Sequence, residues 1–242
     1  MTRNSVNQLK AIKMRLRAIQ YLRLLKKSYT YEKLSRELEL PIPVLNRYVK
    51  GHVLPRDDRA RKIIEFAEKV LNLEKELLRR IKFDREGFFD NTKIIYDINL
   101  MKIIVEKMLS TLNKWNISKV FTAAADGIPL ATLVASELGV DMIYAKREKE
   151  VGIKAFLEER CVLGSSGITV SLYVPRGSIK PRDRVLIVDD IIRTGETQKA
   201  LLNLVKKARA EVAGIFVLIA IGDYWKKHIP ANIPVKIFLN IK

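Results

Sequence analysis

The sequence has 242 residues, a hydrophobic content of 48% and a single cysteine, Cys161. These values are typical of a globular protein, argue against disorder and exclude an internal disulfide. The longest apolar run, residues 212–222, is shorter than the about 20 residues of a membrane span. We therefore expect a cytoplasmic protein without a membrane partner.

Positive charge is concentrated in the first third of the chain. The formal net charge is +18, and residues 1–85 contain 22 Lys and Arg against 10 Asp and Glu. Such an asymmetry is typical of a nucleic-acid-binding module joined to a more ordinary domain.

Helical periodicity predicts three helices in the first 51 residues. Apolar residues recur at helical spacing over 6–25, Thr30 can cap a second helix over 31–38, and Gly51 can end a third over 43–49. Two helices with a three-residue connection form a helix-turn-helix, whose second helix enters the major groove of DNA.

Residues 34–38 (Leu-Ser-Arg-Glu-Leu) and 45–51 (Leu-Asn-Arg-Tyr-Val-Lys-Gly) resemble the helix-turn-helix of bacterial and archaeal repressors. The resemblance implies that Asn46, Arg47 and Lys50 bind double-stranded DNA, since Asn and Arg read adenine and guanine edges well. An all-helical dimerisation or protein-docking domain is the alternative.

Two further helices are predicted over 55–71 and 73–83, and periodicity lapses near residues 87–91. We therefore expect an all-α helix-turn-helix DNA-binding domain over 1–87 and a second, ligand-binding domain over 88–242.

Helices and strands alternate from residue 100 onward. Strands are predicted at 119–124, 141–146, 185–190, 212–221 and 235–240, and helices at 100–113, 128–138 and 198–209. This alternation is typical of an α/β fold with a mostly parallel sheet and helices on both faces.

Two acids end the strand predicted at 185–190. Asp189 and Asp190 follow residues 185–188, and the loop 193–197 then enters a helix. Adjacent carboxylates can accept hydrogen bonds from a sugar diol, and a Thr/Gly loop at a helix start can bind phosphate. The motif indicates a sugar phosphate site; the alternative is that the acids only cap the next helix.

Residues 185–197 resemble the phosphoribosyl diphosphate (PRPP) motif of type I phosphoribosyltransferases, and residues 92–242 have the length and element order of that domain. The residues implied to bind PRPP are Asp189, Asp190, Arg193, Thr194, Gly195, Glu196 and Thr197. Mg²⁺ is the implied cofactor, beside Asp189 and Asp190. Arg193 and Glu196 depart from the family pattern, and a Glu facing a phosphate is unfavourable. We therefore expect Glu196 to point away or to cap its helix.

Two more segments resemble the diphosphate-binding parts of orotate phosphoribosyltransferases. They are Ala125, Asp126 and Gly127 at one strand-to-helix turn, and Lys146, Arg147 and Lys149 after the next strand. Asp126 stands where that enzyme has Lys, so Mg²⁺ bridging is needed unless Asp126 is only a helix cap. The alternative for the basic run is that it forms a solvated surface.

Residues 156–173 predict a two-stranded excursion with an uncharged tip at 164–167. It resembles the flap that closes over PRPP. Tyr224 and Trp225 are either a hood against a base or core aromatics.

The whole layout resembles archaeal regulators with a helix-turn-helix and an orotate-phosphoribosyltransferase-like domain, the GfcR-like group. That resemblance implies a homodimeric transcription regulator, not an enzyme, which senses PRPP or a nucleotide and controls purine or pyrimidine genes. The alternative is an active purine or orotate phosphoribosyltransferase with an accessory basic domain. Asp126, Glu196 and the uncharged flap tip argue against turnover, because none of them stabilises a departing diphosphate.

Overall fold

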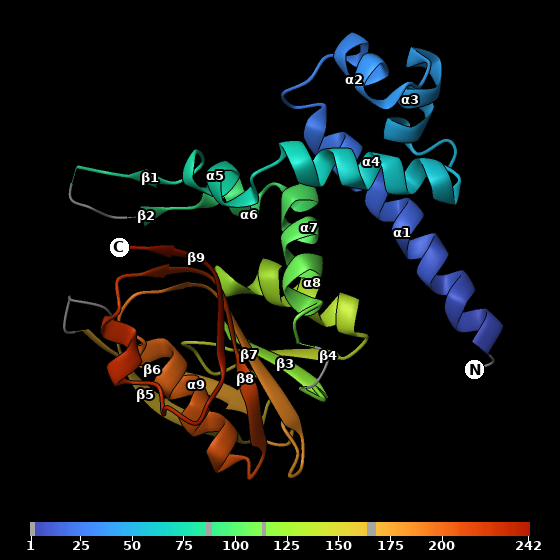
Figure 1. Ribbon diagram of the computed structural model, residues 1–242. Helices are drawn as coiled ribbons and strands as arrows, with labels where there is room; N and C mark the ends of the chain where they lie inside the picture. The colour runs from blue at the N-terminus through green and yellow to red at the C-terminus, as the bar shows by residue number, and fades with distance from the viewer. Residues whose placement is uncertain (1–2, 86–88, 113–114, 164–167) are drawn as a thin grey trace. The chain divides into compact units, whose positions relative to one another are not determined.

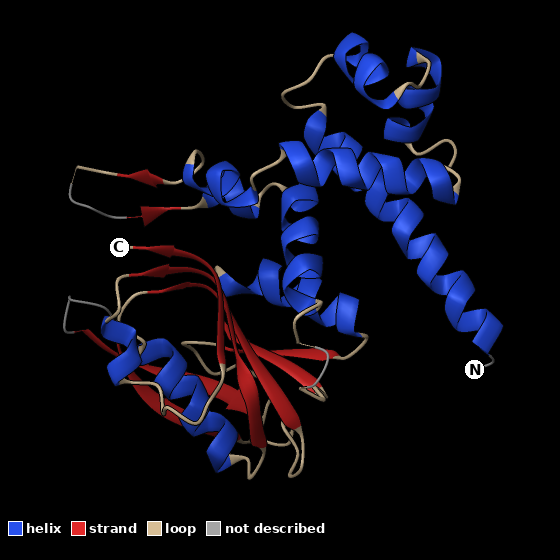
Figure 2. Ribbon diagram, in the orientation of Figure 1, coloured by secondary structure: helices blue, strands red, loops and turns tan. Residues whose placement is uncertain are grey.

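The computed structural model describes residues 3–85, 89–112, 115–163 and 168–242. The chain divides into two compact units, Met1–Ile104 and Val105–Lys242 (Figure 1). The first is mostly helical, and the second contains the large sheet (Figure 2). Within the described ranges, no helix is long and apolar enough to cross a membrane. The predicted domain boundary between residues 87 and 88 stays a prediction.

Helices dominate the first unit. Its elements are α1 (Arg3–Leu25), α2 (Tyr31–Leu38), α3 (Ile42–Lys50), α4 (Asp57–Val70), α5 (Leu73–Leu78), β1 (Lys82–Phe83), β2 (Phe89–Asp90) and α6 (Thr92–Ile95). Helix α7 (Ile98–Leu109) begins here and continues into the second unit.

The short helices α2 and α3 lie where the sequence predicts them. Thr30 Oγ1 accepts a hydrogen bond from the Lys33 amide at 3.3 Å at the start of α2. Helix α3 ends at Gly51, which has a φ of +77°. Leu34, Leu38 and Leu45 are buried between the helices. Two packed helices do not by themselves show a helix-turn-helix domain.

The helix predicted over 73–83 is shorter than expected. Helix α5 ends at Leu78, and the two-residue strand β1 pairs antiparallel with β2. The rings of Phe83 and Phe89 meet edge to face with 5.5 Å between their centroids. The apolar residues near position 83 therefore pack across a strand pair and do not extend a helix.

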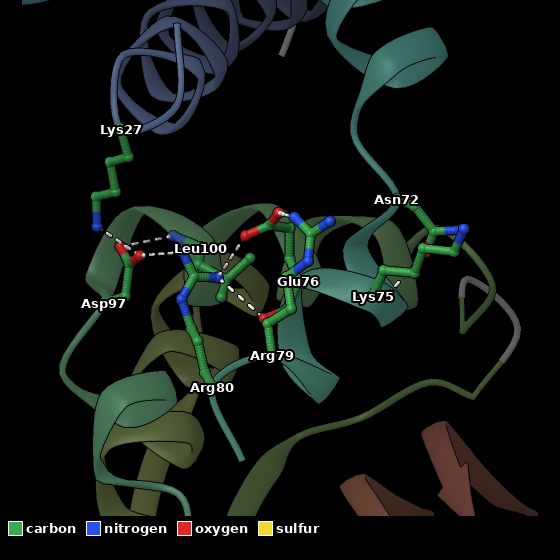
Figure 3. Close-up of polar contacts among 8 residues, drawn as sticks. All are labelled: Lys27, Asn72, Lys75, Glu76, Arg79, Arg80, Asp97 and Leu100. Carbon is green, nitrogen blue, oxygen red and sulfur yellow. Dashed lines mark hydrogen bonds and ion pairs between the residues drawn. The ribbon is translucent and has the colours of Figure 1, made fainter. Parts of the chain in front are cut away.

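A buried carboxylate connects three helices of the first unit. Asp97 Oδ2 lies 2.5 Å from Lys27 Nζ and 3.4 Å from Arg80 Nη2, and its Oδ1 accepts a hydrogen bond from the Leu100 amide at 3.3 Å (Figure 3). Arg80 also pairs with Glu76 on α5. Asp97 therefore caps α7 and holds the end of α1 and the residues after α5 against it.

A parallel sheet forms the centre of the second unit. In the described chain its strand order is β4-β3-β7-β8-β9, and every pairing is parallel. The strands are β3 (Lys119–Ala123), β4 (Asp141–Ala145), β7 (Arg184–Ile192), β8 (Glu211–Ile221) and β9 (Val235–Ile241). The predicted α/β fold with a parallel sheet is confirmed.

Helices cover both faces of this sheet. Helix α8 (Gly127–Leu138) packs on β3, β4 and β7, and α9 (Glu196–Lys207) lies on the opposite face in Figure 1. Helix α9 also packs on the hairpin of β5 (Phe156–Leu163) and β6 (Ile168–Pro175). This hairpin confirms the predicted two-stranded excursion, and its tip, residues 164–167, lies outside the described residues.

The strand register brings three chain segments to one edge of the sheet. Ala123 pairs with Ala145 at the carboxyl ends of β3 and β4, and β7 lies on the other side of β3. The residues that follow these strands therefore meet at the edge where ligands bind in open parallel sheets.

Candidate active site

A cavity of about 250 Å³ lies at this edge of the sheet. Three strand ends and the β5–β6 hairpin contribute to it. Its lining consists of Ala123, Ala124, Ala125, Asp126, Gly127, Arg147, Cys161, Leu172, Asp189, Asp190, Ile191 and Thr197. The fold thus brings together seven of the residues that the sequence singled out: Ala125, Asp126, Gly127, Arg147, Asp189, Asp190 and Thr197.

The two acids of the PRPP motif lie deep in this cavity. Asp189 is 7% exposed and Asp190 is 6% exposed. Asp189 Oδ2 accepts a hydrogen bond from Gln198 Nε2 at 2.5 Å, and its Oδ1 accepts one from the Asp190 amide at 3.1 Å. Burial, and next the neighbouring Asp190 carboxylate, raise the pKa of Asp189 well above its ordinary value.

This pair of carboxylates fits a divalent cation, because two adjacent buried acids repel each other until a positive charge comes between them. Across the described ranges, no group of three His, Cys, Asp or Glu side chains could hold a metal ion. Mg²⁺ at this place would therefore take most of its oxygen ligands from a phosphorylated substrate and from water.

The turn between β3 and α8 packs tightly against Asp189. The peptide bond between Ala124 and Ala125 is cis. A Cβ atom at Gly127 would lie 2.2 Å from Thr122 Oγ1 and 2.9 Å from Asp189 Oδ1. Only glycine leaves room for the first turn of α8 beside the acid. Asp126 precedes this turn, is exposed, and makes no side-chain cap to the helix.

The phosphate loop predicted at 193–197 contributes only Thr197 to the cavity lining. Arg193 is exposed, and Thr194 Oγ1 lies 3.5 Å from the Glu196 amide. Gly195 has a φ of +83°, and a Cβ there would lie 3.0 Å from the Trp225 carbonyl oxygen. Both facts require glycine at this position.

Glu196 is not among the residues that line the cavity. Its Oε1 lies 2.6 Å from His228 Nδ1, although this buried nitrogen makes no hydrogen bond. The two side chains form an ion pair when the imidazole is charged. The Glu196 charge therefore does not confront an anion in the cavity.

The basic run after β4 is divided by the fold. Arg147 lines the cavity. Lys146 pairs with Glu150, and Lys149 lies 3.7 Å from Glu158, so both lysines are engaged by acids outside the lining.

Sequence reasoning missed Gln198, Cys161 and Leu172. Gln198 is 2% exposed on the buried face of α9, and a lone polar residue on an otherwise apolar helix face was the signal for it. Cys161 Sγ lies 3.9 Å from Thr197 Oγ1, and burial raises the pKa of its thiol. Cys161 and Leu172 come from the hairpin, and no local pattern marks which hairpin residues face the cavity.

The aromatic pair after β8 has one buried and one exposed member. Trp225 is 6% exposed and donates a hydrogen bond from Nε1 to the Gly222 carbonyl at 3.1 Å. Tyr224 is 55% exposed. Trp225 is therefore a core aromatic, which is the second of the two alternatives given for this pair.

The residues predicted to bind DNA lie on α3. Asn46 Oδ1 accepts a hydrogen bond from the Tyr31 hydroxyl at 3.2 Å. Arg47 and Lys50 are exposed.

Comparisons with known proteins identify the family. The phosphoribosyl transferase domain family matches residues 91–233, more than half of the chain, and the chain belongs to this family. A xanthine phosphoribosyltransferase from Bacillus cereus is 34% identical over 164 residues, which cover 66% of this chain and 81% of that protein. One from Streptococcus gordonii is 31% identical over 124 residues, which cover 51% of this chain and 64% of that protein.

Solved structures agree with the family assignment. An adenine phosphoribosyltransferase from Rhodothermus marinus superposes with a TM-score of 0.63 at 27% identity, over 70% of this chain and 98% of that one.

These comparisons contradict the predicted DNA-binding transcription regulator, and with it the prediction that the protein is not an enzyme. Both of these xanthine phosphoribosyltransferases are bacterial proteins, and they do not support an archaeal regulator. An excess of Lys and Arg is not specific to DNA binding; some of these residues form ion pairs within the unit, such as Arg15 with Asp57 at 2.6 Å and Arg17 with Glu68 at 2.9 Å. The argument against turnover from Glu196 fails because its carboxylate faces His228.

Proposed function

We propose that this protein is a purine phosphoribosyltransferase, which transfers the phosphoribosyl group of PRPP to xanthine or a related 6-oxopurine. The observation that carries the proposal is the cavity in which Asp189 and Asp190 meet the Ala124–Ala125 turn. The 34% identity to a protein named xanthine phosphoribosyltransferase supports the choice of acceptor.

Each part of the cavity has a role in this reaction. Asp189 and Asp190 accept hydrogen bonds from the two ribose hydroxyls, and charge-assisted acceptance gives these bonds their strength. The loop 193–197 donates backbone N–H groups to the 5-phosphate at the start of α9. The 124–127 turn and Arg147 face the diphosphate.

The chemistry is a substitution at the ribose C1 carbon. A ring nitrogen of the purine forms the new bond as the bond from C1 to the diphosphate oxygen breaks, and the diphosphate leaves with the electron pair. The purine nitrogen loses its proton to water. Mg²⁺ neutralises charge on the leaving group when bound, and Arg147, the guanidinium in the lining, adds to that stabilisation.

The accessory basic domain over 1–87 and the homodimer belong to this proposal as predictions. So does Mg²⁺ beside Asp189 and Asp190. The proposal requires no DNA contact.

The test is a product assay with PRPP and Mg²⁺. Xanthine, guanine, hypoxanthine, adenine and orotate are offered separately, and nucleotide formation is followed by chromatography. We expect turnover with a 6-oxopurine and its loss when EDTA removes Mg²⁺. Absence of turnover with all five bases would overturn the proposal, and turnover with orotate alone would reassign the acceptor.

Two neighbouring cations provide a matched pair of variants. Arg147→Gln removes a charge-assisted contact worth about 1.5 to 3 kcal/mol, so kcat/KM should fall roughly 10- to 100-fold. Lys149→Gln removes the same charge outside the cavity and should leave kcat/KM almost unchanged. Equal losses in both variants would mean that the long-range charge, and not the contact, matters.

A further inference from the structure

A second and larger cavity, of about 550 Å³, lies on the α9 side of the sheet. It is formed by the exposed face of α9, the start of β8 and the chain that follows the 3-10 helix Tyr224–Lys227. The volume falls within the range of about 300 to 1,000 Å³ that is typical of small-molecule sites. None of its lining residues lines the catalytic cavity.

The lining combines an apolar floor with a cationic rim. Leu202 of α9, Val212 of β8 and Ile233 form the floor. Lys199 and Lys206 are exposed and stand seven residues apart on α9, which places them on the same face of the helix two turns apart. A ligand that combines a flat ring with an anionic group would fit an apolar floor beside two cations.

The other polar residues at the rim do not neutralise the positive charge of Lys199 and Lys206. Glu211 contributes the only acid among the lining residues, and it pairs with Arg184 at 2.7 Å. Asn232 is exposed at the rim and offers both a donor and an acceptor.

We propose that this cavity is an effector site for a nucleoside monophosphate. The base would lie on Leu202, Val212 and Ile233, the ribose would reach Asn232, and the phosphate would pair with Lys199 and Lys206. Inorganic phosphate would leave the apolar floor in water, and a neutral nucleoside would leave both lysines unpaired.

One contact connects this cavity to the catalytic one. His228 lines the effector cavity, and its Nδ1 lies 2.6 Å from Glu196 Oε1. Glu196 is the first residue of α9, and the next residue, Thr197, lines the catalytic cavity. A ligand that draws His228 or shifts α9 therefore moves the phosphate loop, and by linkage PRPP must change the affinity for the effector by the same factor.

The test uses 8-azidoadenosine 5′-monophosphate as a photoactivated probe on the full chain. Labelling is done in excess Mg²⁺-PRPP, so that the catalytic cavity is occupied, and labelled peptides are identified by mass spectrometry. We expect PRPP-resistant labelling within residues 199–212 or 228–233. Label confined to peptides with residues 123–127 or 189–197, or no label, would overturn the effector site. Because no turnover is measured, this failure is distinct from failure of the proposed reaction.

Matched variants test the role of the cationic rim. Lys199→Gln/Lys206→Gln should lower PRPP-resistant labelling at least 10-fold. Lys180→Gln/Arg182→Gln, which removes the same charge from exposed residues outside both cavities, should leave it unchanged. Equal labelling in the two variants would overturn the assignment of the phosphate to Lys199 and Lys206.

Coupling is measured on the covalently labelled protein. After PRPP and free probe have been removed, the effector cavity stays filled while the catalytic cavity is empty. We expect the Kd for PRPP, measured by calorimetry, to differ roughly 5-fold or more from that of unlabelled protein. An identical Kd would show that His228 and Glu196 do not transmit occupancy.

Discussion

Two buried aspartates, one in each unit, have opposite surroundings. Asp97 in the first unit is 8% exposed and touches two cations, Lys27 and Arg80, and the Leu100 amide. Asp189 in the second unit is 7% exposed and accepts hydrogen bonds from the Gln198 amide group and the Asp190 backbone. Similar burial therefore comes with charge compensation in one unit and with a second carboxylate in the other.

The difference separates an acid that stabilises the fold from one that serves a ligand. A buried carboxylate that holds two cations is satisfied without further partners. A buried carboxylate beside another acid keeps an unfavourable charge that a sugar hydroxyl or a metal ion can relieve, and its pKa is raised because burial and Asp190 both oppose ionisation. Strongly perturbed acids in cavities mark functional sites for this reason.

The largest expected effect is on PRPP binding. Asp189→Asn/Asp190→Asn removes two charge-assisted acceptors, each worth about 1.5 to 3 kcal/mol, so the Kd for Mg²⁺-PRPP should rise roughly two to four decades. Titration calorimetry measures it. Asp97→Asn is the control, and it should leave the Kd unchanged. A Kd for Mg²⁺-PRPP equal to that of the wild type in the double variant would show that Asp189 does not serve this ligand.

The next effect is on stability. Asp97→Ala leaves Lys27 and Arg80 without their carboxylate and removes the cap of α7, so the free energy of unfolding of the first unit should fall by about 3 to 5 kcal/mol. Urea denaturation followed by circular dichroism measures it. Asp141→Asn, which breaks an exposed pair with Lys119, should cause little change. A similarly small change in the free energy of unfolding for Asp97→Ala would mean that the contacts of Asp97 do not stabilise the first unit.

A smaller effect is expected at Gln198, which positions Asp189 and does not reach the substrate. Gln198→Leu removes a hydrogen bond to a charged acceptor, worth about 1.5 to 3 kcal/mol, and should raise KM for PRPP roughly 10-fold or more. The KM for the purine should stay constant, since the lost bond supports only the ribose site. Partial recovery in Gln198→Asn would support positioning, whereas equal changes in both KM values would indicate general unfolding.

The smallest expected effect concerns the pH dependence of stability. Because the pKa of Asp189 is raised in the folded chain, its protonated form favours folding. This contribution is fully present below the ordinary pKa of aspartate and is lost as the pH rises through the raised value. Asp189→Asn should therefore be slightly more stable than the wild type at neutral pH, with a flatter pH profile, although the amide loses part of its hydrogen bonding to Gln198. Thermal melts from pH 3 to 8 decide this; a variant less stable at pH 8 contradicts it.

The sequence predicted the parts of this molecule that local patterns determine. Apolar residues 185–188 and the acids that follow predicted both β7 and the cavity acids, because a strand buried on both faces and two adjacent carboxylates are local signals. It could not predict that Arg147 enters the cavity while Lys149 turns to Glu158, since Glu158 lies on β5 and is brought there by the tertiary fold; Lys146 pairs locally with Glu150, four residues further on. Cys161 and Leu172 enter from a hairpin whose packing on α9 no short pattern encodes.

Function was less predictable than fold. The helix spacing over 31–50 and the excess of Lys and Arg are shared by many helical domains, and they favoured a regulator that the family comparisons contradict. Arg15, Arg17 and Lys27 each pair with an acid at least 42 residues away. Long-range pairing of this kind is invisible to composition.

The contact between Lys27 and Asp97 also bears on the order in which the chain can fold. Their positions differ by 70 residues, so helices α1 to α5 are synthesised before the carboxylate that joins α1 to α7. At a synthesis rate of about 5 to 20 residues per second, the end of α1 waits several seconds for its partner. A fragment that stops at residue 87 never receives it, so a stable isolated helical fragment should be made to extend at least to the end of the first unit at Ile104.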